Sequence, residues 1–219
     1  MAEGAALLQI LTWLSPSFPT GGFAYSHALE WSVEAGDVGG EAALMAWIED
    51  ILWHGALWTD AILVRLAHQA DADGLDELAA FGASLGASAE RRLESLAQGA
   101  AFRAAAKPWC RGCLSRFDDA ALPYPVAVGA LAGLWGVAVA DVVLAYLHTA
   151  VANLVSAGLR LIPLGQDAGL RVQSGLAASV LAVEAATAQA GPEDCGGCAW
   201  RGEIGAMRHE TQYTRLFRT

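Results

Sequence analysis

Apolar residues recur at helical spacing along most of this 219-residue chain. The longest such run lies between positions 41 and 69, where apolar side chains return every three or four residues. This pattern predicts one or two amphipathic helices, and Gly55 marks a candidate break between them. No segment alternates convincingly between apolar and polar positions, so we expect no β-strand.

Turn residues divide the remaining chain into further segments with helical spacing. We expect helices at 5–14, 24–35, 75–86, 89–106, 125–135, 138–161 and 165–189. Residues 107–123 are interpreted as a connector with one helical turn. The sequence therefore predicts a single all-α domain over 1–219, a helical bundle of about eight to ten helices without internal repeats. An N-terminal helix and aromatic turn (1–23) open the domain, and a C-terminal docking tail (199–219) closes it.

The composition indicates which partners the chain can have. Hydrophobic residues make up 55% of the chain and charged residues 16%, so part of its apolar surface is expected to contact other protein. With 13 basic against 23 acidic residues, a net charge of -10 excludes sequence-independent nucleic-acid binding and disfavours anionic membranes. The first residues carry no basic region of a secretory signal, so we expect a cytoplasmic protein.

Four cysteines form two Cys-x-x-Cys pairs, Cys110 with Cys113 and Cys195 with Cys198. Two such pairs could supply the four thiolates of a zinc site, or act in redox chemistry, although they lie much farther apart than in compact zinc modules. His209 is a further weak candidate for a metal ligand. The chain has no phosphate-binding loop, nucleophile elbow or zinc-protease helix, which favours a binding protein over an enzyme.

Two long uncharged runs, on either side of Asp141, also fit a membrane-spanning helical hairpin. Basic flanks are missing, however, and the second run carries polar residues along one helical face. This polar stripe predicts a seam between helices, an internal passage or a subunit contact; its members are Asp141, Thr149, Asn153, Ser156 and Arg160.

Two segments are typical of contact surfaces. In "WLSPSFPTGGFAYSHALEW", prolines and adjacent glycines build a stiff turn that carries Pro19, Phe23 and Tyr25. In "RHETQYTRLFRT", basic side chains alternate with large apolar ones; the residues of interest are Arg208, Tyr213, Arg215, Leu216 and Phe217. Either segment could instead pack on the body of its own subunit.

These two segments, with "ERRLESLAQGAAF", "YPVAVGALAGLWGV" and "LIPLGQDAGLRV", resemble the urease accessory protein F (UreF) family. The matches occur in the family's order from Leu7 to Thr219. The resemblance implies a non-enzymatic, all-helical homodimer without a stable cofactor. It also implies a scaffold that bridges the accessory protein UreD/UreH and the GTPase UreG, so that nickel reaches apo-urease, with modulation of the GTPase and an internal nickel route as further roles.

The resemblance also assigns residues. Pro19, Phe23 and Arg215 match family positions needed to recruit the GTPase, and we add Tyr25 as their neighbour. The tail around Arg208, Tyr213, Leu216 and Phe217 is similar to a segment that becomes ordered when UreD/UreH binds. The two Cys-x-x-Cys pairs are not part of the family pattern.

Overall fold

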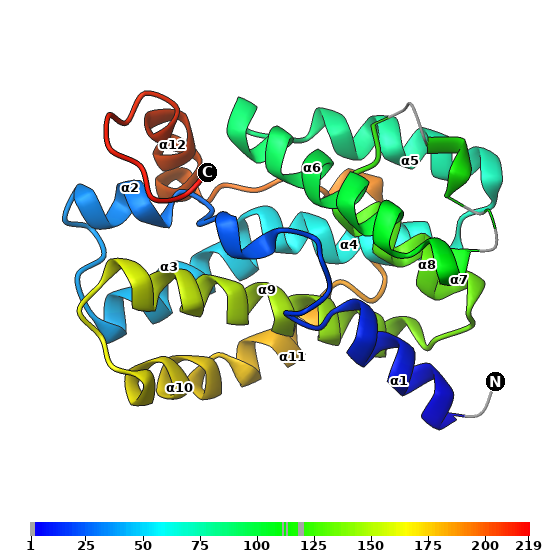
Figure 1. The fold of residues 1–219 in the computed structure, drawn as a ribbon, viewed down its shortest axis with the longest axis horizontal. Helices are drawn as coiled ribbons and strands as arrows, with labels where there is room; N and C mark the ends of the chain where they lie inside the picture. The colour runs from blue at the N-terminus through cyan, green and yellow to red at the C-terminus, as the bar shows by residue number, and fades with distance from the viewer. Residues whose placement is uncertain (1–2, 111, 113, 118–120) are drawn as a thin grey trace.

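The structure, a computed structural model, describes residues 3–110, 112, 114–117 and 121–219, and the regular elements among them are all helices (Figure 1). This confirms the predicted all-α fold. The α-helices are α1 (Glu3–Trp13), α2 (Leu29–Glu34), α3 (Glu41–His54), α4 (Ala56–Gln69), α5 (Ala72–Ser84), α6 (Ala89–Ala105), α7 (Lys107–Cys110), α8 (Tyr124–Leu134), α9 (Val139–Leu161), α10 (Gln166–Gly175), α11 (Ala177–Ala186) and α12 (Trp200–His209). Three short 3₁₀ turns join them: η1 (Gly22–Ala24), η2 (Ser115–Phe117) and η3 (Pro192–Asp194).

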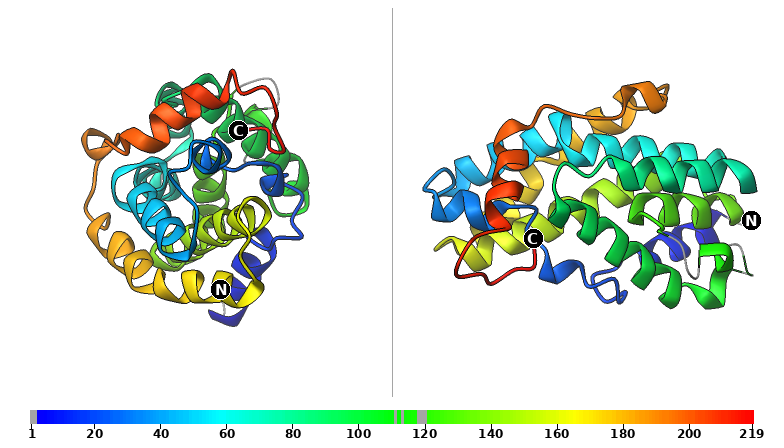
Figure 2. Two further views of the ribbon diagram at one scale, coloured as in Figure 1. Left: turned by 90° about the vertical axis from the view of Figure 1, so that its left-hand side faces the viewer. Right: turned by 90° about the horizontal axis from the view of Figure 1, so that it is seen from above.

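Helix α8 forms the centre of the bundle, and every residue from Pro125 to Ala132 is buried. Its packing on α4 depends on glycine, because a Cβ atom on Gly129 would lie 2.3 Å from the carbonyl oxygen of Val64. One turn later, a Cβ on Gly133 would lie 2.2 Å from the carbonyl oxygen of His68. The other helices enclose this pair, as the view along the bundle in Figure 2 shows.

The predicted break at Gly55 is confirmed, but two other helix predictions were wrong. The helix expected at 24–35 begins only at Leu29, because His27 and Ala28 adopt left-handed conformations with φ of 56° and 67°. The helix expected at 165–189 is two helices that meet at Leu176, whose side chain is buried. The first break carries no glycine or proline that would mark it in the sequence, whereas Gly175 stands directly before the second.

The structure does not support a membrane hairpin. In the described part of the chain, α9 is the one helix long and apolar enough to cross a bilayer, and half of its most apolar window is buried inside the protein. Helix α8 has 11 residues, which is too short for a second span.

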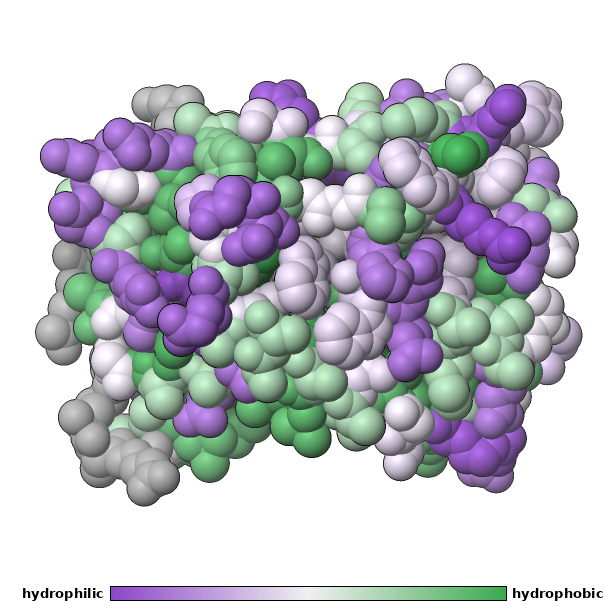
Figure 3. All heavy atoms as spheres, turned by 180° about the vertical axis from the view of Figure 1, so that it is seen from behind, coloured by the Kyte–Doolittle hydropathy of each residue, from purple (hydrophilic) through white to green (hydrophobic). Residues whose placement is uncertain are grey.

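Exposed apolar side chains are nevertheless numerous, as the composition predicts. Figure 3 shows apolar and hydrophilic residues interspersed on the back of the molecule. Large exposed apolar side chains also cluster on two helices; they are Leu7, Leu8 and Leu11 on α1, and Trp200, Ile204 and Met207 on α12.

Candidate docking surface and polar cavity

Helix α9 holds the N-terminal aromatic turn in place through its polar stripe. The hydroxyl of Thr149 donates to the carbonyl oxygen of Leu14 at 3.0 Å. Arg160 Nη1 donates to the carbonyl oxygen of Phe23 at 2.9 Å. Between these two anchors the turn approaches Asn153 so closely that a Cβ on Gly22 would lie 3.1 Å from its amide nitrogen.

The turn presents only part of its predicted contact set to solvent. Phe23 is 68% exposed, and Pro19 is exposed as well. The Arg160 guanidinium stacks on the Phe23 ring, 3.6 Å from its centroid. Tyr25, predicted to be a contact residue, is buried, and this burial raises the pKa of its phenol. The structure therefore makes Tyr25 a support for the turn.

The C-terminal segment docks on its own subunit, which is one of the two alternatives from the sequence. After α12, the chain turns back so that Arg218 N–H donates to the carbonyl oxygen of Ala24 at 2.8 Å. The carbonyl oxygen of Thr219 accepts hydrogen bonds from the Ser26 amide and hydroxyl, at 2.8 and 2.6 Å. Phe217, also a predicted contact, is buried, with its ring centroid 4.2 Å from the Arg160 guanidinium. The remaining predicted tail residues, Arg208, Tyr213, Arg215 and Leu216, are exposed.

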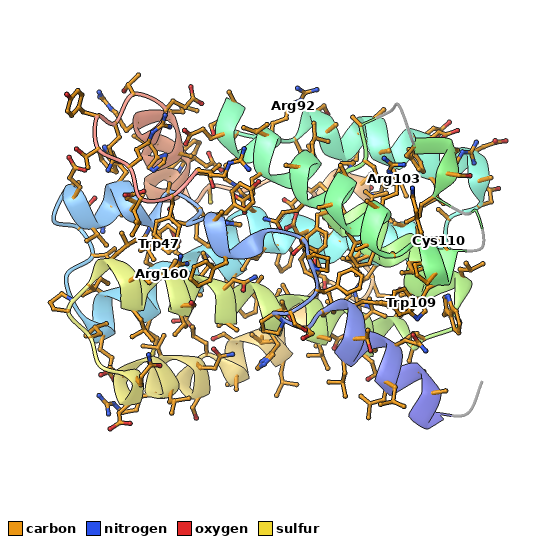
Figure 4. All side chains as sticks on the ribbon, viewed as in Figure 1. Trp47, Arg92, Arg103, Trp109, Cys110 and Arg160 are labelled. Carbon is orange, nitrogen blue, oxygen red and sulfur yellow. The ribbon has the colours of Figure 1, made fainter. Side chains whose placement is uncertain are left out.

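Arg160 thus joins the two segments that the sequence presents separately. Figure 4 labels this side chain on α9, close to both the turn and the tail. We call the surface around it the turn–tail surface; it consists of Pro19, Phe23, Arg160, Arg215, Leu216 and Arg218.

A buried histidine and two carboxylates fasten the tail to the body. His209 is fully buried; its Nε2 lies 3.1 Å from Glu30, and its Nδ1 lies 2.6 Å from Glu90. Both ring nitrogens are thus within hydrogen-bonding distance of a carboxyl oxygen. Glu30 also accepts the amides of Leu216 and Phe217, at 2.6 and 2.9 Å.

Arg215 completes this network by donating to Glu90 at 2.6 Å. His209 therefore has both ring nitrogens occupied by carboxylates. This arrangement does not fit its candidate role as a metal ligand.

A second polar cluster, absent from the predicted site residues, lies on α6. Glu90, Glu94 and Gln98 follow each other at four-residue spacing and are all buried, so this stripe was readable from the sequence. Burial raises the pKa of the Glu94 carboxyl, but the neighbouring Arg91 and His27 outweigh this and hold it well below its ordinary value. The Glu94 carboxylate pairs with Arg91 and lies 3.0 Å from His27 Nδ1.

Beside this cluster lies a polar cavity of about 40 Å³ between α4, α6, α8 and α9, large enough for water. Asp60 on α4 faces it and accepts a hydrogen bond from the Tyr146 hydroxyl at 2.8 Å. Burial raises the pKa of Asp60 above its ordinary value, although Arg91 and Tyr146 act in the opposite direction. A second cavity of about 100 Å³ adjoins the first, and the two share four lining residues, His27, Asp60, Arg91 and Ser95.

The residues of the polar stripe on α9 lie in different environments. Thr149 and Asn153 line the polar cavity, and Ser156, whose carbonyl oxygen accepts from Arg160 Nε at 3.2 Å, is partly buried. Asp141 is exposed to solvent at the start of the helix, so it does not lie in a seam within this subunit, and its place in a subunit contact stays a prediction.

The cysteines do not form a metal centre in the described part of the chain. Cys110 is buried in α7, Cys195 and Cys198 lie in the segment before α12, and Cys113 falls outside the described residues. Burial, together with Asp194, raises the pKa of the Cys195 thiol to about 11, which is the opposite of what a redox-active cysteine needs. No group of three or more histidine, cysteine or acidic side chains among the described residues is arranged to hold a metal ion.

The protein is a helical bundle, and its turn–tail surface is basic and aromatic. These features are those of a helical binding protein. Comparison with known proteins gives the particular family. The UreF family model matches residues 38–177, and the chain belongs to this family of urease accessory proteins. It is an accessory protein in urease maturation and not an enzyme.

Curated relatives extend the match to both contact segments. Urease accessory protein UreF of Rhodopseudomonas palustris strain TIE-1 is 45% identical over 99% of this chain and 94% of the relative. UreF of Bradyrhizobium sp. strain ORS 278 is 44% identical over 100% of this chain and 94% of the relative. UreF of Agrobacterium fabrum is 43% identical over 98% of this chain and 97% of the relative. The aromatic turn and the tail, which lie outside residues 38–177, are therefore covered by these relatives.

Proposed function

We propose that this protein is the scaffold that connects the accessory protein UreD/UreH with the GTPase UreG, so that nickel reaches apo-urease. The turn–tail surface is the observation that carries this proposal. Phe23 is an exposed aromatic side chain, at 68%, yet its carbonyl oxygen and its ring are both fixed by Arg160. Rigid, exposed aromatic residues beside arginine are typical of the side chains that dominate protein–protein binding.

Within this surface, we assign GTPase recruitment to Pro19, Phe23 and Arg215. The exposed tail residues Arg208, Tyr213 and Leu216 are assigned to UreD/UreH. Tyr25 and Phe217 support these contacts from beneath, since both are buried.

We also propose that the protein works as a soluble, cytoplasmic homodimer. Helix α1 supports this proposal, because Leu7, Leu8 and Leu11 are each more than half exposed. A groove of about 970 Å³ runs between α1 and α9, lined largely by apolar side chains. A second copy covering this face would account for an apolar surface that a monomer leaves in water.

Nickel is cargo in this proposal and not a resident cofactor. If the ion passes through this chain, the polar cavity offers the most suitable oxygen ligands, since the carboxyl groups of Asp60 and Glu94 line it. Replacement of Asp60 by Asn would then lower urease activation while the complex still assembles.

The assembly is tested by co-expressing this chain with its cognate UreD/UreH and UreG and purifying through a tag on UreD/UreH. We expect all three proteins to co-purify. Phe23→Ala should weaken the affinity for the GTPase about thirtyfold, which corresponds to roughly 2 kcal/mol for an aromatic side chain that becomes buried in the complex. The melting temperature of this variant should not change. Leu181→Ala on α11, which truncates a side chain that is 59% exposed, is the matched control. Full recruitment by the Phe23 variant, or a large fall in its melting temperature, would contradict this assignment.

A further inference from the structure

Two arginines of the turn–tail surface have no carboxylate partner within the part of the chain that the structure describes. They are Arg160 and Arg218, whereas Arg215 of the same surface pairs with Glu90. The chain has 23 acidic and only 13 basic residues, so acidic partners are plentiful. Leaving two guanidinium groups unpaired at one surface of such a protein indicates that their partner comes from elsewhere.

The geometry around Arg160 leaves donors available. A guanidinium has five N–H donors, and the described contacts use Nε for the Ser156 carbonyl oxygen and Nη1 for that of Phe23. The guanidinium carbon lies 3.6 Å from the centroid of the Phe23 ring and 4.2 Å from that of the Phe217 ring. The N–H donors lie in the plane of the guanidinium, so those that remain point outward from its edge. Partial burial lowers the pKa of Arg160.

Arg218 is fixed against the aromatic turn by its backbone. Its N–H donates to the carbonyl oxygen of Ala24, and its guanidinium lies 6.0 Å from the ring centroid of Tyr25. The side chain itself is exposed. The apolar neighbours Phe23 and Leu216 are exposed at 68% and 66%, so both charge and apolar area are presented together.

We propose that the turn–tail surface binds a protein segment in which a carboxylate side chain is flanked by apolar residues. The carboxylate accepts a forked pair of hydrogen bonds from Arg160, Arg218 supplies the second cationic contact, and the apolar neighbours cover Phe23 and Leu216. The net charge of -10 disfavours the phosphates of nucleic acids or lipids as alternatives. This inference rests on the proposed scaffold function and specifies the chemistry of the partner's contact.

The first experiment measures affinity for purified UreG and for UreD/UreH at several salt concentrations, with Arg160→Gln, Arg160→Lys and Arg218→Gln. Arg201→Gln, on the exposed first turn of α12, is the matched control. We expect each glutamine variant to bind one of these partners about tenfold or more weakly, with a shallower salt dependence, because a charge-assisted contact is lost. The lysine variant should keep the salt dependence and lose part of the affinity, since it retains charge but not the fork.

The second experiment uses a short synthetic peptide that alternates leucine and glutamate, and its counterpart with glutamine. The glutamate peptide should bind wild-type protein and not the Arg160→Gln variant, and the glutamine peptide should not bind. Equal binding of both peptides overturns the inference, as does wild-type affinity and salt dependence in both glutamine variants. Salt-sensitive self-association that disappears in Arg160→Gln also overturns it, in favour of a second copy of this chain. Failure of the wild type to capture either partner refutes the scaffold function, and the peptides then decide this inference alone.

Discussion

Replacing His209 by alanine tests how the tail is held. The imidazole is fully buried between Glu30 and Glu90, whose side chains are only 8% and 10% exposed. Its removal leaves the carboxyl groups of Glu30 and Glu90 in the interior without the hydrogen-bonding group between them. Removing one partner from a buried ion pair costs about 3–5 kcal/mol.

The remaining contacts place the expected cost at the lower end of that range. Glu30 keeps the two amide hydrogen bonds from the tail, and Glu90 keeps the Arg215 guanidinium. We therefore expect a loss of about 3 kcal/mol, which for a domain of this size lowers the melting temperature by about 6–12 °C. The tail should also become susceptible to limited proteolysis, because His209 contacts α2 and α6 at once.

Thermal unfolding followed by circular dichroism measures the first effect, and a protease time course measures the second. His54→Ala, which removes an exposed histidine, serves as the control. Adding Glu90→Gln to His209→Ala should restore part of the stability, since a neutral amide removes the repulsion between the carboxylates while its oxygen still accepts from Arg215. A melting temperature within about 2 °C of wild type, with a protected tail, would refute the role assigned to this imidazole.

Three further outcomes follow from the structure. The lowered pKa of Glu94 stabilises the fold fully above the pKa of an unfolded glutamate, and this contribution declines as the pH falls toward the folded-state pKa; urea unfolding should therefore show a deficit for Glu94→Gln that is largest at pH 7 and clearly smaller at pH 3. Iodoacetamide at pH 8 should label the exposed Cys198 well before Cys195, because the Cys195 thiol, with a pKa of about 11, is only about one part in a thousand ionised at that pH. Mass spectrometry measures the two labelling rates, and equal rates would contradict this expectation. Gly133→Ala should lower the free energy of unfolding by about 1–3 kcal/mol or more, because the new methyl group meets the carbonyl oxygen of His68. Gly39→Ala is the control and should have little effect, since a Cβ atom there meets no other atom within 4 Å.

The fold was predictable because apolar spacing is a local property of the sequence. Helices such as α6 and α9 begin and end within a residue or two of their expected bounds. The start of α2 was not predictable in this way, since His27 and Ala28 carry side chains that usually avoid left-handed conformations. Their conformation is accompanied by hydrogen bonds from Ser26 to Thr219, at the opposite end of the sequence.

The candidate site likewise contains features that the local sequence predicts and features that depend on long-range contacts. The exposed positions of Phe23 and Arg215 agree with the surface expected from the turn and tail segments. The burial of Tyr25 and Phe217 depends on contacts between those two segments, which no local pattern encodes. The pairing of His209 with Glu30 joins positions 179 residues apart, and only the folded chain brings them together.

The turn–tail surface has a consequence for how the protein is made. Its parts come from the first thirty residues, from the last turn of α9 and from residues 215–218, so it is complete only after all three segments have been synthesised and have folded together. A nascent or truncated chain can form several of its helices without ever fixing Phe23 against both Arg160 and the tail. Any partner that recognises the complete surface therefore distinguishes a chain folded through residue 218 from one in which the tail is undocked.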